Sequence, residues 1–229
     1  MSGGAPRFVV VASTAGSVLN QCLSNGYFRE RIHSVVVDQP CAAADRAQEH
    51  GPPVVSLFAE DNDAFCAHLL DYLVRERIDY VLSFYTRFYS KPLRDAYRDR
   101  IVNLHPSILP AFKGMDGFGD QMRYHVPFVG STVELIDEAM DEGKIIMQAL
   151  FPRDPALALA DVRHRLFVQQ CRSLIQVVAW LDEGRVNVEG RHVSIVGSRY
   201  GDPEFSPSLD SHHAIALCVP DLQSAKQAL

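Results

Sequence analysis

The chain has 229 residues, of which 47% are hydrophobic and 22% are charged, and its formal net charge is −6. These values are typical of a globular protein with one large domain and argue against a disordered or fibrous class. An acidic chain offers no basic surface for nucleic acid or an anionic membrane, so we expect neither as a partner. No apolar run is long enough for a signal peptide or a transmembrane helix. Five widely spaced cysteines without a CxxC pair favour a reducing cytoplasm over a disulfide framework.

The first half of the chain alternates short β-branched runs with helical stretches. We expect strands at residues 8–12, 32–37, 54–57, 80–84 and 101–104, and helices at residues 18–23, 42–50, 62–76 and 91–97. This alternation predicts a parallel sheet with helices on both faces. The strands are almost continuously apolar, as is typical of strands that are buried on both sides.

The pattern changes after residue 130. Two extended runs, residues 130–136 and 144–151, are separated only by a short acidic segment, which predicts a hairpin-like connection and not a crossover helix. A long helix with a period close to 3.6 follows at residues 155–182 and ends near Gly184. We expect one short strand at residues 192–196 and a last helix in the tail.

Polar residues directly after strands are the first candidates for a site, because ligands of open α/β sheets bind at the carboxyl ends of strands. Ser13, Gly16 and Ser17 follow the first strand, where backbone N–H groups at a helix start could hold an anion such as phosphate. The alternative for this segment is an ordinary turn with Ser17 as the helix N-cap.

Asn103 and His105 follow each other with one residue between them at the end of an expected strand. Period-2 alternation places both side chains on one face, where their N–H groups could stabilise an oxyanion. The alternative is that the pair only hydrogen-bonds loop backbone. Asp141 lies in the acidic segment between the two late strands, and beside His105 it would hold the ring in one tautomer. The alternative for Asp141 is a solvated loop carboxylate.

Two further carboxylates, Asp116 and Glu134, lie near these residues and could meet a cationic acceptor, or could be surface charges. The pair His212–His213 in the tail suggests a metal ligand set, but a third ligand at suitable spacing is missing. We therefore expect no metal.

Two motifs resemble a known family. NLHPSILPAFKG at residues 103–114 is followed by GSTVELIDEAMDEGKIIMQ at residues 130–148. Together they resemble the folate-dependent formyltransferase family, over about residues 7–188 and most of all its glycinamide ribonucleotide branch. The resemblance implies a doubly wound, mostly parallel α/β sheet of Rossmann-like type with a long C-terminal helix. It also implies that the enzyme transfers a formyl group from 10-formyltetrahydrofolate, its co-substrate, to an amine.

By this resemblance Asn103 and His105 would bind the oxyanion of the tetrahedral intermediate, and Asp141 would pair with His105 and help to move the amine proton. The pterin would lie near the segment before the asparagine strand and near the aspartate loop. The matching cofactor candidates are Arg87, Phe88, Tyr89, Ile136, Asp137 and Glu138. Phe88 and Tyr89 could equally be core aromatics.

The residues expected to bind the formyl acceptor differ from those of the glycinamide ribonucleotide branch. The phosphate loop of that branch is matched by residues 14–18, which keep the Gly-Ser pair but lose both asparagines. Gln170 stands in place of a ribose-contacting glutamate, and Asp116 belongs to a segment that replaces a His-rich element. The candidates for acceptor binding are Ser13, Gly16, Ser17, Asp116 and Gln170. The acceptor is then glycinamide ribonucleotide or a specialised amino sugar, amino acid or biosynthetic amine.

We expect residues 1–196 to form the catalytic domain and residues 197–229 a tail that acts as a lid or an interface element. The oligomeric state stays open, with a homodimer as one alternative. Two other functions remain open as well. One is a hydrolase that releases formate from 10-formyltetrahydrofolate, and the other is a non-catalytic module that binds folate or nucleotide on the same fold.

Overall fold

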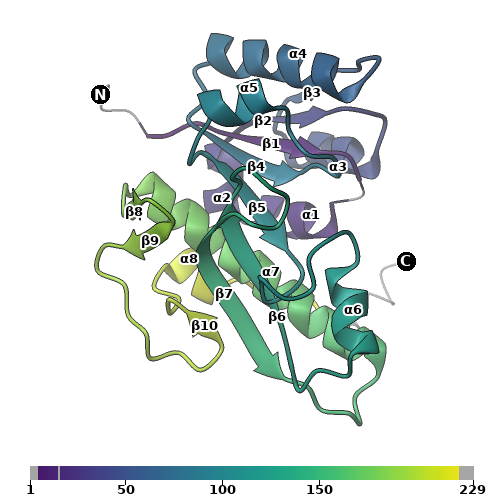
Figure 1. Cartoon of the computed structure of the whole chain (residues 1–229), viewed down its shortest axis with the longest axis vertical. Coiled ribbons are helices and arrows are strands. Elements are labelled where there is room, and N and C mark those ends of the chain that lie inside the picture. The colour runs from purple at the N-terminus through teal and green to yellow at the C-terminus, as the bar shows by residue number, and fades with distance from the viewer. Residues whose placement is uncertain (1–4, 15, 222–229) are drawn as a thin grey trace.

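The fold is built on one eight-stranded sheet with helices on both faces (Figure 1). The computed structural model describes residues 5–14 and 16–221. The strand order is β10-β7-β6-β5-β4-β1-β2-β3, and β8 and β9 form a separate pair. The strands are β1 (Phe8–Ala12), β2 (Ile32–Val37), β3 (Val54–Ser56), β4 (Tyr80–Phe84), β5 (Ile101–His105), β6 (Phe128–Leu135), β7 (Lys144–Pro152), β8 (Val186–Glu189), β9 (His192–Ile195) and β10 (Phe205–Ser206). The helices are α1 (Ser17–Leu23), α2 (Gly26–Arg31), α3 (Ala42–His50), α4 (Asn62–Arg75), α5 (Lys91–Ala96), α6 (Gly117–Arg123), α7 (Leu159–Asp182) and α8 (His212–Ile215).

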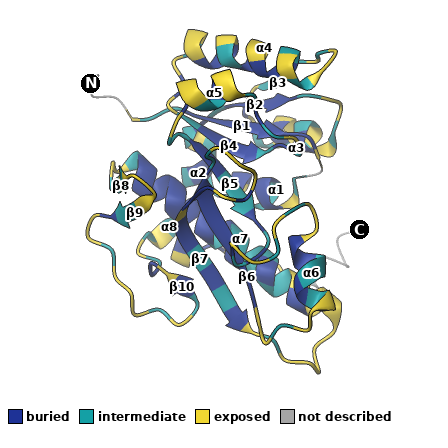
Figure 2. Cartoon of the chain, in the orientation of Figure 1, coloured by how far each residue is buried: buried dark blue, intermediate teal, exposed yellow. Residues whose placement is uncertain are grey.

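The first five strands are parallel, which confirms the expected doubly wound α/β sheet. β1 lies in the middle and alternates its side chains between the two faces. Phe8 and Val10 pack in the core shared with α1, α3 and α7, whereas Val9 and Val11 pack in the core under α4 and α5. Figure 2 shows the central strands and most of α7 buried, and the outer faces of α4 and α5 exposed.

The late strands are antiparallel, as the short connection between them predicts. β6 pairs with β5 on one side and with β7 on the other, and the pairing of β6 with β7 runs from Phe128 to Leu135. The segment between β6 and β7, residues 136–143, leaves β6 where Leu135 pairs with Val102 near the start of β5, and folds back so that Asp141 reaches His105 at the end of β5. This arrangement brings the two sequence motifs together.

Helix α7 begins at Leu159, four residues after the expected start. The side chain of Asp154 accepts a hydrogen bond from the backbone N–H of Ala156, and this local turn competes with the helix. The expected end is confirmed, because the helix stops at Asp182 and Gly184 has a φ of 65°.

The tail after β9 packs against the main body. β10 pairs with β7, and α8 contacts α7. Residues 222–229 of the expected tail element lie outside the described residues. Sequence periodicity did not predict α2, α6, β8 and β10, which are short or rich in glycine. Over the described ranges, no helix has the length and apolar character needed to cross a membrane.

Candidate active site

Strands β5 and β6 place four polar side chains on one face of the sheet. In the antiparallel register Asn103 lies opposite Glu134, and His105 lies opposite Thr132. Directly opposed residues share a face, and their side chains are close enough to interact. The amide Nδ2 of Asn103 donates to Glu134 Oε1 over 3.1 Å, so these two side chains are in direct contact.

Asp141 lies beside His105. Its Oδ1 is 3.3 Å from His105 Nδ1, and both side chains are 6% exposed. Its Oδ2 accepts a hydrogen bond of 2.6 Å from the backbone N–H of Gly114. The other ring nitrogen of His105, Nε2, is 2.9 Å from the carbonyl oxygen of Phe112. Both ring nitrogens thus face oxygen atoms. The carbonyl oxygen of Phe112 can only accept a hydrogen bond, and so can the carboxylate of Asp141 when it is ionised. Both contacts are hydrogen bonds when each ring nitrogen carries a proton.

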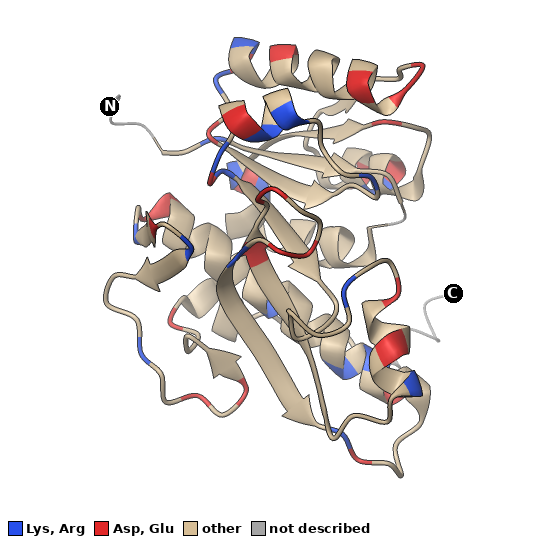
Figure 3. Cartoon of the chain, viewed as in Figure 1, with Lys and Arg blue, Asp and Glu red and all other residues tan. Residues whose placement is uncertain are grey.

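The backbone of Asp141 supports this contact. Its φ is 55°, in the left-handed region that only Gly, Asn and Asp visit readily. The loop thereby turns the carboxylate inward toward β5, although three neighbouring acidic residues of the loop are not buried. Figure 3 shows these acidic residues gathered on the loop between β6 and β7.

Glu134 is the site residue whose position the sequence did not reveal. It is 1% exposed, and its Oε2 accepts a second hydrogen bond, 2.8 Å long, from the backbone N–H of Gly143. Burial raises the pKa of the Glu134 carboxyl, and the hydrogen bonds from Asn103 and Gly143 oppose that rise. The alternation of β6 was a signal for its inward direction, but nothing in the sequence gives the register with β5.

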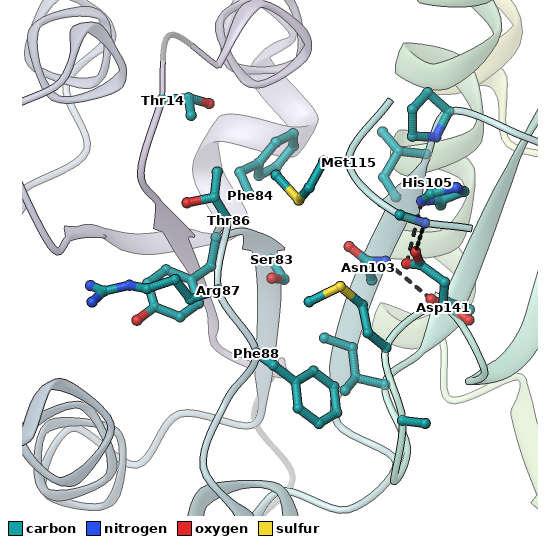
Figure 4. A pocket seen from close by; sticks show the side chains of 18 residues that line it. Thr14, Ser83, Phe84, Thr86, Arg87, Phe88, Asn103, His105, Met115 and Asp141 are labelled. Carbon is teal, nitrogen blue, oxygen red and sulfur yellow. Dashed lines mark hydrogen bonds and ion pairs between the residues drawn. The ribbon is translucent and has the colours of Figure 1, made fainter. Parts of the chain in front are cut away.

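These residues line a cavity of about 240 Å³ at the carboxyl ends of β4 and β5. Asn103, His105 and Asp141 lie on one side of it, and Thr86 and Arg87 lie on the opposite side (Figure 4). The cavity therefore has these three polar side chains on one wall and room beside them for a ligand.

Three of the six cofactor candidates line this cavity, namely Arg87, Phe88 and Ile136. Arg87 forms an ion pair of 2.8 Å with Asp38, and the guanidinium of Arg94 lies 4.4 Å from the Phe88 ring centre. The other three candidates are elsewhere. Tyr89 is 1% exposed in the core and donates to Ser83 Oγ, while Asp137 and Glu138 border a separate, charged depression outside the loop.

A second cavity of about 500 Å³ lies between α1, α6 and α7. Three acceptor candidates, Ser17, Asp116 and Gln170, line it. Pro106 and Met115 line both cavities, so the two spaces meet beside His105. Asp116 also caps α6 by accepting from Gly119, and it forms an ion pair with Arg123. Apolar side chains of α6 and α7 supply much of the remaining wall.

The two other acceptor candidates, Ser13 and Gly16, are not in the wall of this cavity. Ser13 is 2% exposed, and its hydroxyl accepts from the backbone N–H of Thr86. Gly16 precedes α1 in the left-handed conformation, with a φ of 58°. A side chain there would also approach the Cβ of Ala43 at 3.2 Å. Across residues 5–14 and 16–221, no group of three or more His, Cys, Asp or Glu side chains could hold a metal ion.

A family model for formyl transferases matches residues 7–178, well over half of the chain. The chain belongs to the formyl transferase family. The match spans both motifs and every strand from β1 to β7. This membership confirms the resemblance that the two motifs carry.

Individual relatives of this formyl transferase agree with the family model. A phosphoribosylglycinamide formyltransferase of Mycobacterium tuberculosis is 32% identical over 81% of this chain and 89% of its own length. The crystal structure of glycinamide ribonucleotide transformylase 1 from Symbiobacterium toebii has a TM-score of 0.78 at 29% identity, covering 84% of this chain and 95% of that one. A formyltetrahydrofolate deformylase from Pseudomonas putida shares the fold, with a TM-score of 0.74, 23% identity and coverage of 84% and 71%.

Proposed function

We propose that this formyl transferase moves the formyl group of 10-formyltetrahydrofolate to the amine of a small molecule. The observation that carries the proposal is the convergence of Asn103, His105 and Asp141 at one wall of a cavity. Amide and imidazolium N–H groups that are fixed before the reaction stabilise the negative charge that develops on an attacked carbonyl oxygen.

In the proposed reaction the lone pair of the acceptor nitrogen attacks the formyl carbon, and the carbonyl oxygen becomes an oxyanion. Asn103 keeps one Nδ2 proton for this oxygen, since the other goes to Glu134. His105 would donate from Nε2 by exchanging the carbonyl oxygen of Phe112 for the oxyanion. The acceptor nitrogen loses a proton, N10 of the folate gains one, and the bond between the formyl carbon and N10 breaks to release tetrahydrofolate.

Asp141 supports both parts of this reaction. Its carboxylate next to His105 Nδ1 stabilises the imidazolium form of the ring and fixes its orientation. The same carboxylate is positioned to take part in moving the proton from the acceptor nitrogen, directly or through water. The Gly114 N–H that binds its second oxygen keeps the carboxylate in place.

The two cavities support separate places for the two substrates. We place the folate in the first cavity, where Phe88, Ile136 and Arg87 offer apolar and cationic contacts. We place the acceptor in the second, against Ser17, Asp116 and Gln170, with its amine reaching His105 past Met115. The names of the relatives make glycinamide ribonucleotide the first acceptor to test. An amino sugar, an amino acid or another biosynthetic amine remains an alternative.

We also propose a domain organisation, an oligomeric state and a cellular compartment. We expect residues 1–196 to be the catalytic domain and the tail from residue 197 to be an interface or lid element, in a monomer or homodimer without nucleic acid. The pairing of β10 with β7 supports a tail that is fixed to the sheet edge. The five free cysteines support a reducing, cytoplasmic compartment.

The test is absorbance-monitored release of tetrahydrofolate from 10-formyltetrahydrofolate, with glycinamide ribonucleotide, with a panel of other amines and with no amine. We expect turnover that depends on an amine and that is abolished in His105→Ala but retained in His68→Ala, whose histidine is exposed on α4. Turnover without any amine would make the protein a hydrolase. Folate binding without turnover on any amine would make it a non-catalytic binding module.

A further inference from the structure

The carboxylate of Glu134 lies between the strand that carries Asn103 and the loop that carries Asp141. Its Oε1 accepts from Asn103 Nδ2 at 3.1 Å, and its Oε2 accepts from Gly143 N at 2.8 Å. At 1% exposure it has almost no contact with water, so these two N–H groups are its main partners. A buried carboxylate is costly and persists where its hydrogen bonds serve a purpose.

We propose that Glu134 is a positioning residue of the formyl transfer site, one that fixes the amide of Asn103 and anchors the loop of Asp141. This inference rests on the proposed function, because it concerns the donor that the oxyanion would meet. Glu134 itself does not need to touch either substrate.

Asn103 and Glu134 differ in the hydrogen bonds that their side chains can make. An asparagine amide can present either its oxygen or its nitrogen to a neighbour, because the two ends are similar in size. An ionised carboxylate can only accept hydrogen bonds, so it selects the nitrogen end of Asn103. One proton of Nδ2 is then directed at Glu134 on β6, and the second is left for the oxyanion. The oxyanion thus meets a donor of fixed orientation.

The second contact explains a glycine in the loop. A Cβ at Gly143 would lie 2.2 Å from the carbonyl oxygen of Leu135 and 2.7 Å from Glu134 Oε2. Only glycine allows this N–H to approach the carboxylate so closely. Gly143 is two residues after Asp141, so the bond to Glu134 ties down the end of the loop that places Asp141 against His105.

Glu134→Gln tests the inference because it has the same size but a different hydrogen-bonding pattern. The backbone N–H of Gly143 is a fixed donor, so the glutamine must turn its oxygen toward it. Its NH₂ group then faces Asn103, which must present its oxygen and rotate its own NH₂ away. The variant therefore imposes the opposite orientation on Asn103 while filling the same space.

We expect Glu134→Gln to lower kcat by about 10-fold to 10³-fold, up to the loss expected for a missing oxyanion donor. The KM for 10-formyltetrahydrofolate should stay within about threefold, since the contacts proposed for the folate are those of Arg87, Phe88 and Ile136. A double-mutant cycle with Asn103→Ala decides whether Glu134 acts through Asn103. In the Asn103→Ala background, Glu134→Gln should lower kcat by less than about threefold. Equal losses in both backgrounds, or no loss in either, would overturn the inference.

Glu49→Gln, the same chemical change at an exposed position of α3, is the matched control and should leave kcat unchanged. If Glu134→Gln does not fold, Glu134→Met goes through the same cycle, because it also removes the acceptor from Asn103. A readout independent of turnover is the side-chain amide resonance of Asn103 in nitrogen-15 NMR. It should shift in the Glu134 variant and stay in the Glu49 control, and an unshifted resonance contradicts the inference even if the wild type transfers no formyl group.

Discussion

Asp141→Asn separates the charge of the carboxylate from its shape. Asparagine adopts the left-handed conformation as readily as aspartate, so the φ of 55° at this position adds no strain. The backbone N–H of Gly114 must still meet an oxygen, which leaves the NH₂ group of the asparagine facing His105 Nδ1. The ring nitrogen must then act as an acceptor, so His105 keeps only its Nε2 proton and is neutral.

A neutral ring is a weaker donor to the oxyanion, and it has no carboxylate to stabilise the imidazolium. We expect kcat to fall by about 10²-fold to 10³-fold, which corresponds to about 2.7–4 kcal/mol of lost transition-state stabilisation. The KM for 10-formyltetrahydrofolate should change little, because neither substrate is proposed to be held by this carboxylate.

The assay is steady-state release of tetrahydrofolate with saturating acceptor, accompanied by a thermal melt of each variant. Asp71→Asn, the same change on the exposed face of α4, serves as the control and should match the wild type. A kcat of Asp141→Asn within threefold of the wild type, with an unchanged melt, would refute the role assigned to the pair of Asp141 and His105.

Three other changes test the packing around the site. Thr132→Val should lower the free energy of unfolding by about 1–3 kcal/mol, because its buried hydroxyl accepts from a backbone N–H that would lose its partner; equal urea midpoints would contradict this. Gly117→Ala should lower kcat with a smaller effect on the free energy of unfolding, because its Cβ would lie 2.9 Å from His105 Nε2; an unchanged kcat would show that the ring can move away. Burial raises the pKa of Asp210, but the bond from Arg185 and further N–H donors outweigh burial and hold it below the usual aspartate value. Its contribution is therefore present above the unfolded-state pKa and lost as the pH falls, so Asp210→Asn should destabilise the protein at pH 7 and much less near pH 3, as measured by thermal melts.

Local patterns in the sequence predicted the bounds of several elements and missed others. The predicted bounds of β1, β2, α3 and β4 agree with the structure residue for residue: the apolar runs of β1 and β2 end before Ser13 and Asp38, and α3 ends before Gly51. Helix α6 could not be found in this way, since it contains two glycines and depends on Asp116 as its cap. β10 is only two residues long and exists because the edge of β7 offers partners.

The sequence by itself also predicted the residues that we propose for the reactive group. Alternation in β5 predicted Asn103 and His105 on one face, the acidic segment between the late strands offered Asp141, and the family resemblance paired Asp141 with His105. The 3.3 Å approach of Asp141 to His105 depends on a left-handed turn 36 residues further along the chain, and no local pattern encodes it. Local pattern also failed to place Tyr89. Its side chain lies in the core and not in the cavity wall, because it packs under α4 and α5.

Only the tertiary structure decided the place of Glu134. A glutamate in the sequence is most often a solvated charge, and the place of Glu134 near the two motifs suggested only a contact with a cationic acceptor. The antiparallel register of β5 and β6 sets it opposite Asn103, and a shift of one residue would have turned it to the other face of the sheet. Register is fixed by the packing of both strands against the whole core, and for that reason the partner of a site residue emerges only when the sheet is assembled.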